Sequence, residues 1–151
     1  MLEIARRNIA PTPYAGTVTL VNANALALPF PPASFAAASI GFALRNVPDI
    51  AATIAEMARV VRPGGRVVAL EIAKPTLPIF RELFFLHFNH VVPIIGRLIS
   101  GSSDAYRWLP ASLAPLPSPE AIRFIFARVG LKDARFVRLS GGIVIAHVGS
   151  V

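Results

Sequence analysis

One stretch constrains the fold more than any other: residues 56–75, EMARVVRPGGRVVALEIAKP, where a helical pattern changes into a strand pattern. Residues 48–61 place apolar side chains at helical spacing, whereas residues 66–73 have the composition of a strand. Pro63-Gly64-Gly65 lies between the two patterns. Proline cannot continue a helix, and glycine supplies the left-handed backbone of a helix C-cap. The predicted order is helix, turn, strand, which indicates an α/β chain.

The two glycines could instead form a phosphate-binding loop, because Arg62 and Arg66 stand on either side of them. Phosphate loops lie where a strand runs into a helix, so that the N–H groups of the helix N-terminus face the anion. Here the helix comes first, and its C-terminal end carries partial negative charge. We therefore predict a turn at Gly64-Gly65.

Strand and helix patterns also occur elsewhere along the chain. Strands are expected at 16–23, at 36–44 (a short, buried apolar run), at 132–140 and at 142–150. Helices are expected at 2–10, 78–100 and 118–130 in addition to 48–61. Ser118 is predicted to cap the last helix with Pro119 at its first position, and Gly141-Gly142 is predicted to join the last two strands as a hairpin. The chain is thus predicted to form a sheet with helices on its faces and an antiparallel hairpin at its C-terminal end.

Composition limits the functions that such a chain can have. Of the 151 residues, 54% are hydrophobic and 15% are charged, so the chain is unusually apolar for a single soluble domain. This excess of apolar residues implies an apolar ligand, a membrane surface or a missing piece of protein that covers them. The net charge of +7 is scattered, with only Arg6 and Arg7 adjacent among the arginines. This argues against nucleic-acid binding and suits an anionic membrane surface.

Composition also bears on metal sites and on where in the cell the protein is expected. The absence of cysteine excludes disulfides and thiolate metal sites, and fits a cytoplasmic protein. His87 and His90 are three residues apart, but no carboxylate joins them at ligand spacing, so no metal site is predicted. No run of 18 uninterrupted apolar residues predicts a transmembrane helix.

Two loops that follow predicted strands carry candidate binding residues, NANALALPF (22–30) and GFALRNVPD (41–49). Ligands of open α/β sheets bind beyond the carboxyl ends of the strands. Asn24 offers a donor and an acceptor, enough to read an adenine edge. Arg45 and Asn46 stand between an apolar strand and a helix, and could equally be a surface arginine and a helix cap.

Six segments occur in an order that resembles the ubiquinone/menaquinone C-methyltransferases of the UbiE/MenG type. They are NANALALPFPPASF, IGFALRNVPD, EMARVVRPGGRVVALEIAKP, HVVPIIGRLIS, DAYRWLPAS and LSGGIVIAHVG. The third segment and F-x-L-R-N are rather specific, whereas P-G-G alone is shared by many class I methyltransferases. The resemblance covers nearly the whole chain. It implies a Rossmann-like class I methyltransferase fold, of which 1–151 would be the C-terminal two-thirds, with a substrate-cover insertion at 78–115.

The resemblance also implies a reaction: C-methylation of a prenylated quinol, either demethylmenaquinol or a ubiquinone precursor, with S-adenosylmethionine (SAM) as methyl donor. Asn24 and Ala25 match the family's adenine-contacting pair, and Gly41 stands where a cofactor-contacting serine is common. Arg45 matches a residue that orients the quinol or handles its proton, and Asn46 follows it; these two are the catalytic candidates. The substrate-binding candidates, by the same resemblance, are His90 and Tyr106.

The sequence also departs from the family pattern. Leu26 and Ala36 stand where acidic residues are usual. The family's N-terminal half, with the glycine-rich SAM loop and two central strands, is expected upstream of Met1. Without it, the strand at 17–22 has no neighbour and the strand at 36–42 becomes an open apolar edge.

This departure leaves two hypotheses for function. The first is a quinol methyltransferase that, as this truncated chain, does not bind SAM measurably. The alternative is a non-catalytic remnant that acts as a binding or scaffold protein, with an oligomer or partner chain covering the open edge. The expected location is the cytoplasm, peripheral at the inner face of the membrane.

Overall fold

The computed structural model describes residues 1–73, 86 and 115–151. Its centre is a four-stranded sheet with the order β1-β2-β4-β3. The strands are β1 (Phe35–Gly41), β2 (Val61–Ile72), β3 (Lys132–Leu139) and β4 (Val144–Ser150). β1 runs parallel to β2, whereas β4 runs antiparallel to both β2 and β3. The predicted α/β sheet with a C-terminal antiparallel hairpin is confirmed.

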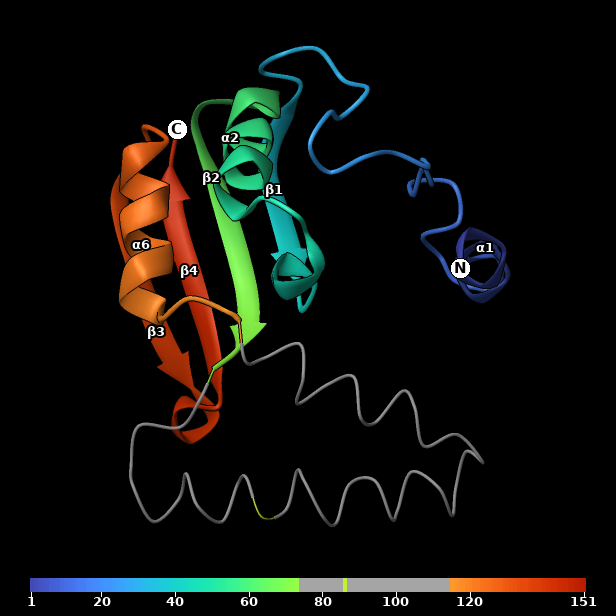
Figure 1. Ribbon diagram of the computed structural model, residues 1–151. Helices are drawn as coiled ribbons and strands as arrows, with labels where there is room; N and C mark the ends of the chain where they lie inside the picture. The colour runs from blue at the N-terminus through green and yellow to red at the C-terminus, as the bar shows by residue number, and fades with distance from the viewer. Residues whose placement is uncertain (74–85, 87–114) are drawn as a thin grey trace.

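Two helices, α2 (Ile50–Val60) and α6 (Pro119–Arg128), pack on the same face of this sheet (Figure 1). The Asp49 carboxylate caps α2 by accepting from the Ala52 N–H at 2.9 Å. The Ser118 hydroxyl caps α6 by accepting from the Ala121 N–H at 3.2 Å, as predicted. The helices predicted at 48–61 from apolar spacing and at 118–130 from its cap are therefore confirmed.

The core lies between these helices and the sheet. Its fully buried members include Leu44, Ile54, Val67, Ala69 and Phe126. Alternate residues of β2 point toward the helices, as the period of a strand requires, and the intervening residues are only half-buried or exposed. In the part of the chain that the structure describes, the sheet is thus covered mainly on one face.

The glycine pair does not cap helix α2. The helix ends at Val60, Val61 is extended, and β2 begins there, so the predicted left-handed C-cap is wrong. Instead Gly64, with φ +79°, lies in an irregular part of β2 between the residues that pair with Phe35 and Ala37 of β1. Pairing with β1 extends β2 toward the N-terminus beyond the two glycines. The propensities of the residues in this stretch alone could not indicate that extension.

The backbone of the glycine pair is hydrogen-bonded inside the protein. The Gly64 N–H donates to the Val151 carbonyl at 2.9 Å, and the Gly65 carbonyl accepts from the Val151 N–H at 3.0 Å. A side chain at Gly65 would collide with the Ala36 carbonyl. The glycines therefore permit close backbone packing at this end of β2.

The N-terminal segment contributes little to the core. Helix α1 (Leu2–Ile9) confirms the helix expected at 2–10, but none of its residues is buried in the described structure, and it lies apart from the sheet (Figure 1). The strand predicted at 16–23 is wrong: these residues form turns and irregular backbone. A strand needs a neighbour to satisfy its backbone, and none of the described segments pairs with it.

The strand expected at 36–44 is present as β1, but it is not buried. Most of its residues are exposed, because β2 pairs with one side of it and no described segment pairs with the other. Among the described residues β1 is therefore an edge strand, and its being open in the protein stays a prediction. The helix predicted at 78–100 and nearly all of the 78–115 insertion lie outside the described residues. Among the helices that the structure does describe, none is long and apolar enough to cross a membrane.

Candidate active site at the carboxyl ends of strands β1 and β2

Several of the predicted site residues gather where the parallel strands β1 and β2 end. Beyond Gly41, the Phe42 N–H still donates to the Leu70 carbonyl at 2.8 Å. Phe42 has φ +56°, an uncommon left-handed conformation for a bulky residue. It precedes the short 3₁₀ helix η1 (Leu44–Asn46), which contacts β2. The turn therefore brings Arg45 to the end of β2.

Arg45 forms a buried ion pair with Glu71. Its guanidinium Nη1 donates to Glu71 Oε1, and its backbone N–H donates to Oε2 at 3.2 Å. The Ile72 N–H adds a third donor to Oε1, at 3.0 Å. Glu71 is 1% exposed and the Arg45 side chain 11%. A carboxylate this deeply buried needs such partners, because an unpaired buried charge is very costly.

Glu71 was not among the residues singled out from the sequence. A signal was present, because Val67, Ala69 and Glu71 alternate on one face of β2 and the first two are fully buried. A carboxylate in that register points into the core and requires a cation. That the cation is Arg45 depends on the parallel pairing of β1 with β2, which the sequence pattern alone does not show.

Gly41 and Asn46 lie at the same edge of the sheet as Arg45. In the described structure nothing lies within 4 Å of a Cβ built at Gly41, so a ligand could approach the backbone there. Asn46 is exposed, and its N–H donates to the Ala43 carbonyl at 2.9 Å. Asn46 does not cap α2, since Asp49 does. Within the described structure a ligand at this edge could reach its exposed side chain.

Asn24 and Ala25 are not joined to this group. The Asn24 Oδ1 accepts from the Leu26 N–H at 3.0 Å, which closes a local Asx turn. Across the described residues, no hydrogen bond or ion pair links Asn24 or Ala25 to Gly41 or Arg45. The amide oxygen that was expected to read an adenine is thus used within its own loop.

The loop that follows Asn24 is attached to helix α2 instead. Glu56 Oε1 accepts from the Leu28 N–H at 2.7 Å, and Arg59 Nη1 donates to the Phe30 carbonyl at 2.9 Å. Glu56 also pairs with Arg59 at 2.7 Å. The hydrogen bond from Arg59, helped by the one from Leu28, lowers the pKa of Glu56 to about 2. This second Glu–Arg pair holds the loop without contributing to the site.

An open hollow lies beside Arg45. It has a volume of about 460 Å³ and is bounded by η1, the start of α2, residues 115–117 and α6. Its lining is mainly apolar, as shown by Val47, Ile50 and Ile125. Besides Arg45, its charged member is Asp49, whose carboxylate caps α2. We call this the Arg45 hollow.

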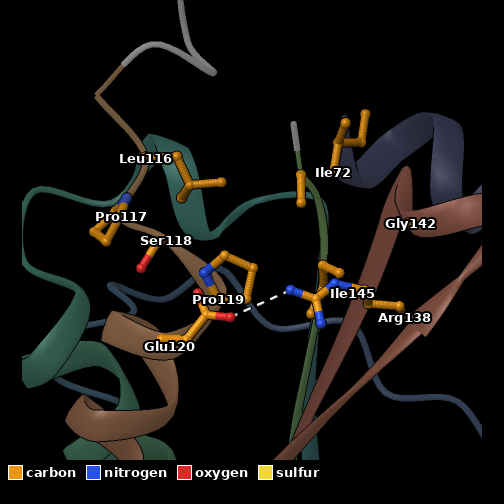
Figure 2. A pocket seen from close by; sticks show the side chains of 10 residues that line it. Ile72, Leu116, Pro117, Ser118, Pro119, Glu120, Arg138, Gly142 and Ile145 are labelled. Carbon is orange, nitrogen blue, oxygen red and sulfur yellow. Dashed lines mark hydrogen bonds and ion pairs between the residues drawn. The ribbon is translucent and has the colours of Figure 1, made fainter. Parts of the chain in front are cut away.

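A second hollow, of about 340 Å³, lies between the start of α6 and the hairpin. Figure 2 shows Glu120 and Arg138 pointing toward each other in it, with an ion-pair distance of 3.2 Å. Nearby, His147 is buried, with Nε2 3.2 Å from the Pro119 carbonyl. Burial lowers the pKa of His147, which favours the neutral ring. Among the described residues that line this hollow, the charged side chains are Glu120 and Arg138, which pair with each other.

The remaining predicted site residues, His90 and Tyr106, lie outside the described residues. Over residues 1–73, 86 and 115–151, no three His, Asp or Glu side chains come close enough to hold a metal ion. The candidate site is therefore Gly41, Arg45, Asn46 and Glu71 beside the Arg45 hollow.

The fold is that of known class I methyltransferases. A SAM-dependent methyltransferase from Thermotoga maritima matches 99% of this chain and 68% of its own chain, with a TM-score of 0.66 and 17% identity. A SAM-dependent methyltransferase from Aquifex aeolicus matches 97% of this chain and 61% of its own, with a TM-score of 0.63 and 12% identity. The chain therefore has the class I SAM-dependent methyltransferase fold, in part of its usual length.

Relatives with higher identity are demethylmenaquinone methyltransferases. That of Desulfitobacterium hafniense is 43% identical over 144 residues, which are 95% of this chain and 57% of the relative. That of Halalkalibacterium halodurans is 41% identical over 149 residues, 99% of this chain and 60% of the relative. The chain thus spans about three-fifths of the length of these relatives. The model of the ubiE/COQ5 methyltransferase family matches residues 1–151, and the chain belongs to that family.

Proposed function

We propose that this chain carries the acceptor-binding part of a SAM-dependent methyltransferase that methylates a ring carbon of a prenylated quinol. Demethylmenaquinol is the favoured acceptor, with a ubiquinone precursor as the other member of the class. Family membership over residues 1–151 and the names of the relatives support this proposal. The observation that carries it is the buried Arg45–Glu71 pair at the carboxyl ends of β1 and β2, beside an apolar hollow.

Arg45 would act on the quinol as a fixed cation. A ring carbon becomes a better nucleophile when the neighbouring hydroxyl loses its proton, and the oxygen then carries negative charge. A guanidinium already held in place stabilises that charge without reorganising. Asn46, exposed next to it, can donate to the same oxygen while water accepts the proton. The site thus favours the ionised ring and holds it in one orientation.

The described residues fit SAM in part. When bound, SAM supplies an electrophilic methyl group. The open backbone at Gly41 permits close approach of a ligand, and the amide nitrogen of Asn24, together with Ala25, would hold the adenine. These groups belong to two separate parts of the described structure, so they hold SAM only weakly. We therefore propose that the chain alone binds SAM too weakly for calorimetry to detect.

The prenyl tail of the acceptor would be held by the 78–115 insertion, with His90 and Tyr106 as its polar contacts. A substrate of this kind resides in a membrane, so we propose that the protein works in the cytoplasm at the inner membrane face. The net charge of +7 supports attraction to anionic lipid. We propose no nucleic-acid partner. A mobility shift of DNA or RNA at physiological salt would contradict this part of the proposal.

Two measurements test the proposed function. Calorimetry with chain 1–151 should detect no SAM binding, and micromolar affinity would contradict the account of the weak cofactor site. The second uses a chimera in which the chain is joined to the part of the D. hafniense relative that it does not match. We expect transfer of the labelled methyl group of SAM to demethylmenaquinol, and at least about a hundredfold loss in the Arg45→Met chimera. A folded chimera that binds SAM but methylates no quinol would overturn the proposal.

The open edge of β1 favours a second candidate function, as a non-catalytic binding or scaffold protein. The outer side of β1 is unpaired among the described residues, and such an edge can accept a strand from another chain or from a second copy. Size-exclusion chromatography and co-purification should then show an oligomer or a stable complex. A chain that stays a soluble monomer at high concentration would argue against this candidate.

A further inference from the structure

We propose that Glu71 is a positioning residue, whose carboxylate holds the Arg45 guanidinium against the Arg45 hollow so that Arg45 donates to an anionic ring oxygen of an aromatic ligand lodged there. The inference rests on the proposed function, because it names the subsite that would hold the ring of the acceptor. It adds a residue that the sequence analysis did not single out and a place for the ligand.

The contacts of Glu71 fix both the backbone and the side chain of Arg45. One carboxylate oxygen accepts the Arg45 backbone N–H at 3.2 Å, and the other accepts from the guanidinium. The second oxygen also accepts the Ile72 N–H at 3.0 Å, which ties the carboxylate to its own strand. Since Glu71 is 1% exposed, it has little freedom to move. An arginine held at two points by a buried carboxylate is preorganised rather than free in solvent.

Arg45 keeps donors that are not used within the described structure. A guanidinium has five N–H groups, and among the described residues only Nη1 is hydrogen-bonded. Nε is buried and has no hydrogen-bond partner in that part of the chain. A buried donor is normally paired with protein, water or ligand, so Arg45 is suited to take a further acceptor.

The lining of the Arg45 hollow indicates which acceptor that is. Val47, Ile50, Leu116 and Ile125 offer apolar surface, which suits a ring or an alkyl group. Asp49, the other charged residue of the lining, lies at the start of α2, where one of its carboxylate oxygens accepts from the Ala52 N–H. Guanidinium donors beside this apolar surface match a molecule that is apolar except for one anionic oxygen, such as a phenolate.

The experiment uses chain 1–151 without SAM and two probes of nearly equal shape. One is 4-nitro-1-naphthol, whose coloured phenolate shows when it is ionised, and the other is its methyl ether, which cannot ionise. Calorimetry at a pH where the naphthol is ionised gives both dissociation constants. We expect the wild-type chain to bind the phenolate at least about tenfold more tightly than the ether, as one charge-assisted hydrogen bond would produce.

Substitution of Glu71 should remove this preference without removing the hollow. Glu71→Gln should weaken phenolate binding about tenfold and leave the affinity for the ether unchanged. Glu56→Gln, which breaks the other Glu–Arg pair, should bind both probes as the wild-type chain does. A role of Glu71 in stability alone would lower the melting temperature and leave the phenolate preference intact.

Folding is checked for each variant by circular dichroism. If Glu71→Gln does not fold, Glu71→Asp replaces it, since it keeps the buried charge but draws the carboxylate back from the Arg45 guanidinium. Glu71→Asp should also lose the phenolate preference. A folded variant that keeps the preference overturns the proposal, and so does a wild-type chain that binds both probes equally. Neither result depends on SAM or on methyl transfer, so failure here is distinguishable from failure of the chimera.

Discussion

Residues 16–23 and 35–41 both have the composition of a strand, yet only the second segment is one. The second segment, β1, pairs in parallel with β2, whereas the first has no partner among the described segments. The two stretches thus differ in their neighbours rather than in their own residues. A strand is stable only when its backbone groups are paired, so alternation shows which residues could form a strand but not whether they do.

The largest effect is expected on truncating a core side chain, tested by a buried and an exposed phenylalanine of helix α6. Phe126 is fully buried in α6, where its ring centroid lies 5.9 Å from that of His147. Phe126→Ala should lower the free energy of unfolding by about 3–5 kcal/mol. Phe124→Ala on the same helix should cost less than about 1 kcal/mol, because Phe124 is 58% exposed. Urea unfolding measures both, and equal losses would show that the helix does not pack on the sheet as described.

Glycine substitution sharpens the same contrast with a smaller effect. A Cβ at Gly65 would collide with the Ala36 carbonyl and the Val61 side chain, so Gly65→Ala should cost about 1–3 kcal/mol. In the described structure nothing lies within 4 Å of a Cβ at Gly16, and Gly16→Ala should change stability by less than about 0.5 kcal/mol. Urea unfolding compares the two variants. A neutral Gly65→Ala would refute the close approach of β1 to the irregular part of β2.

The buried histidine predicts a pH dependence that belongs to the packed region. Burial lowers the folded-state pKa of His147 below its ordinary value of 6.5, so the unfolded chain binds the proton first as the pH falls. This contribution to stability is therefore fully present above about pH 7 and declines as the pH drops below 6.5, by at most about 1.4 kcal/mol per pH unit.

Urea unfolding at several values between pH 7.5 and 5 tests this dependence in the wild-type chain and in His147→Phe, which should lack it. The Glu56 carboxylate contributes to stability over a separate, lower range of pH. Because its pKa is lowered from 4.5 to about 2, its contribution is present above 4.5 and is lost as the pH falls toward 2. If His147→Phe keeps the full dependence between pH 7 and 5, another group is responsible.

The smallest effect is expected in the segment that does not become a strand. Val18 is 42% exposed, so Val18→Thr should change the free energy of unfolding by less than about 0.5 kcal/mol. The same substitution at Val67, which is fully buried in β2, should cost about 1–3 kcal/mol because it buries a hydroxyl. Thermal unfolding of the Val18→Thr and Val67→Thr variants measures both losses of stability. A large cost at Val18 would mean that the segment is packed after all.

The sequence was sufficient where structure depends on nearby residues. The cap at Ser118 predicted the start of α6, and Gly141-Gly142, both with positive φ, predicted the link between β3 and β4. The sequence was insufficient where the structure depends on pairing between segments that are far apart along the chain. The start of β2 at Val61 follows from its parallel partner, and the strand predicted at 16–23 does not form because no described segment pairs with it.

The candidate site shows the same division. Arg45 and Asn46 could be singled out as candidates because polar residues after a strand lie at the carboxyl edge of a sheet. Glu71 was missed because its role depends on a partner 26 positions away along the chain. The separation of Asn24 from Gly41 could not be read from the sequence either, since it depends on which strands are paired.

Amide hydrogen exchange, followed by NMR in chain 1–151, tests the central comparison most directly. The amides of β2 and β4 should be strongly protected from exchange, because each of these strands has a paired strand on both sides. The amides of residues 17–22 should exchange at nearly the rate of an unfolded peptide. Protection of residues 17–22 equal to that of β4 would show that the segment is a paired strand, and would contradict the account.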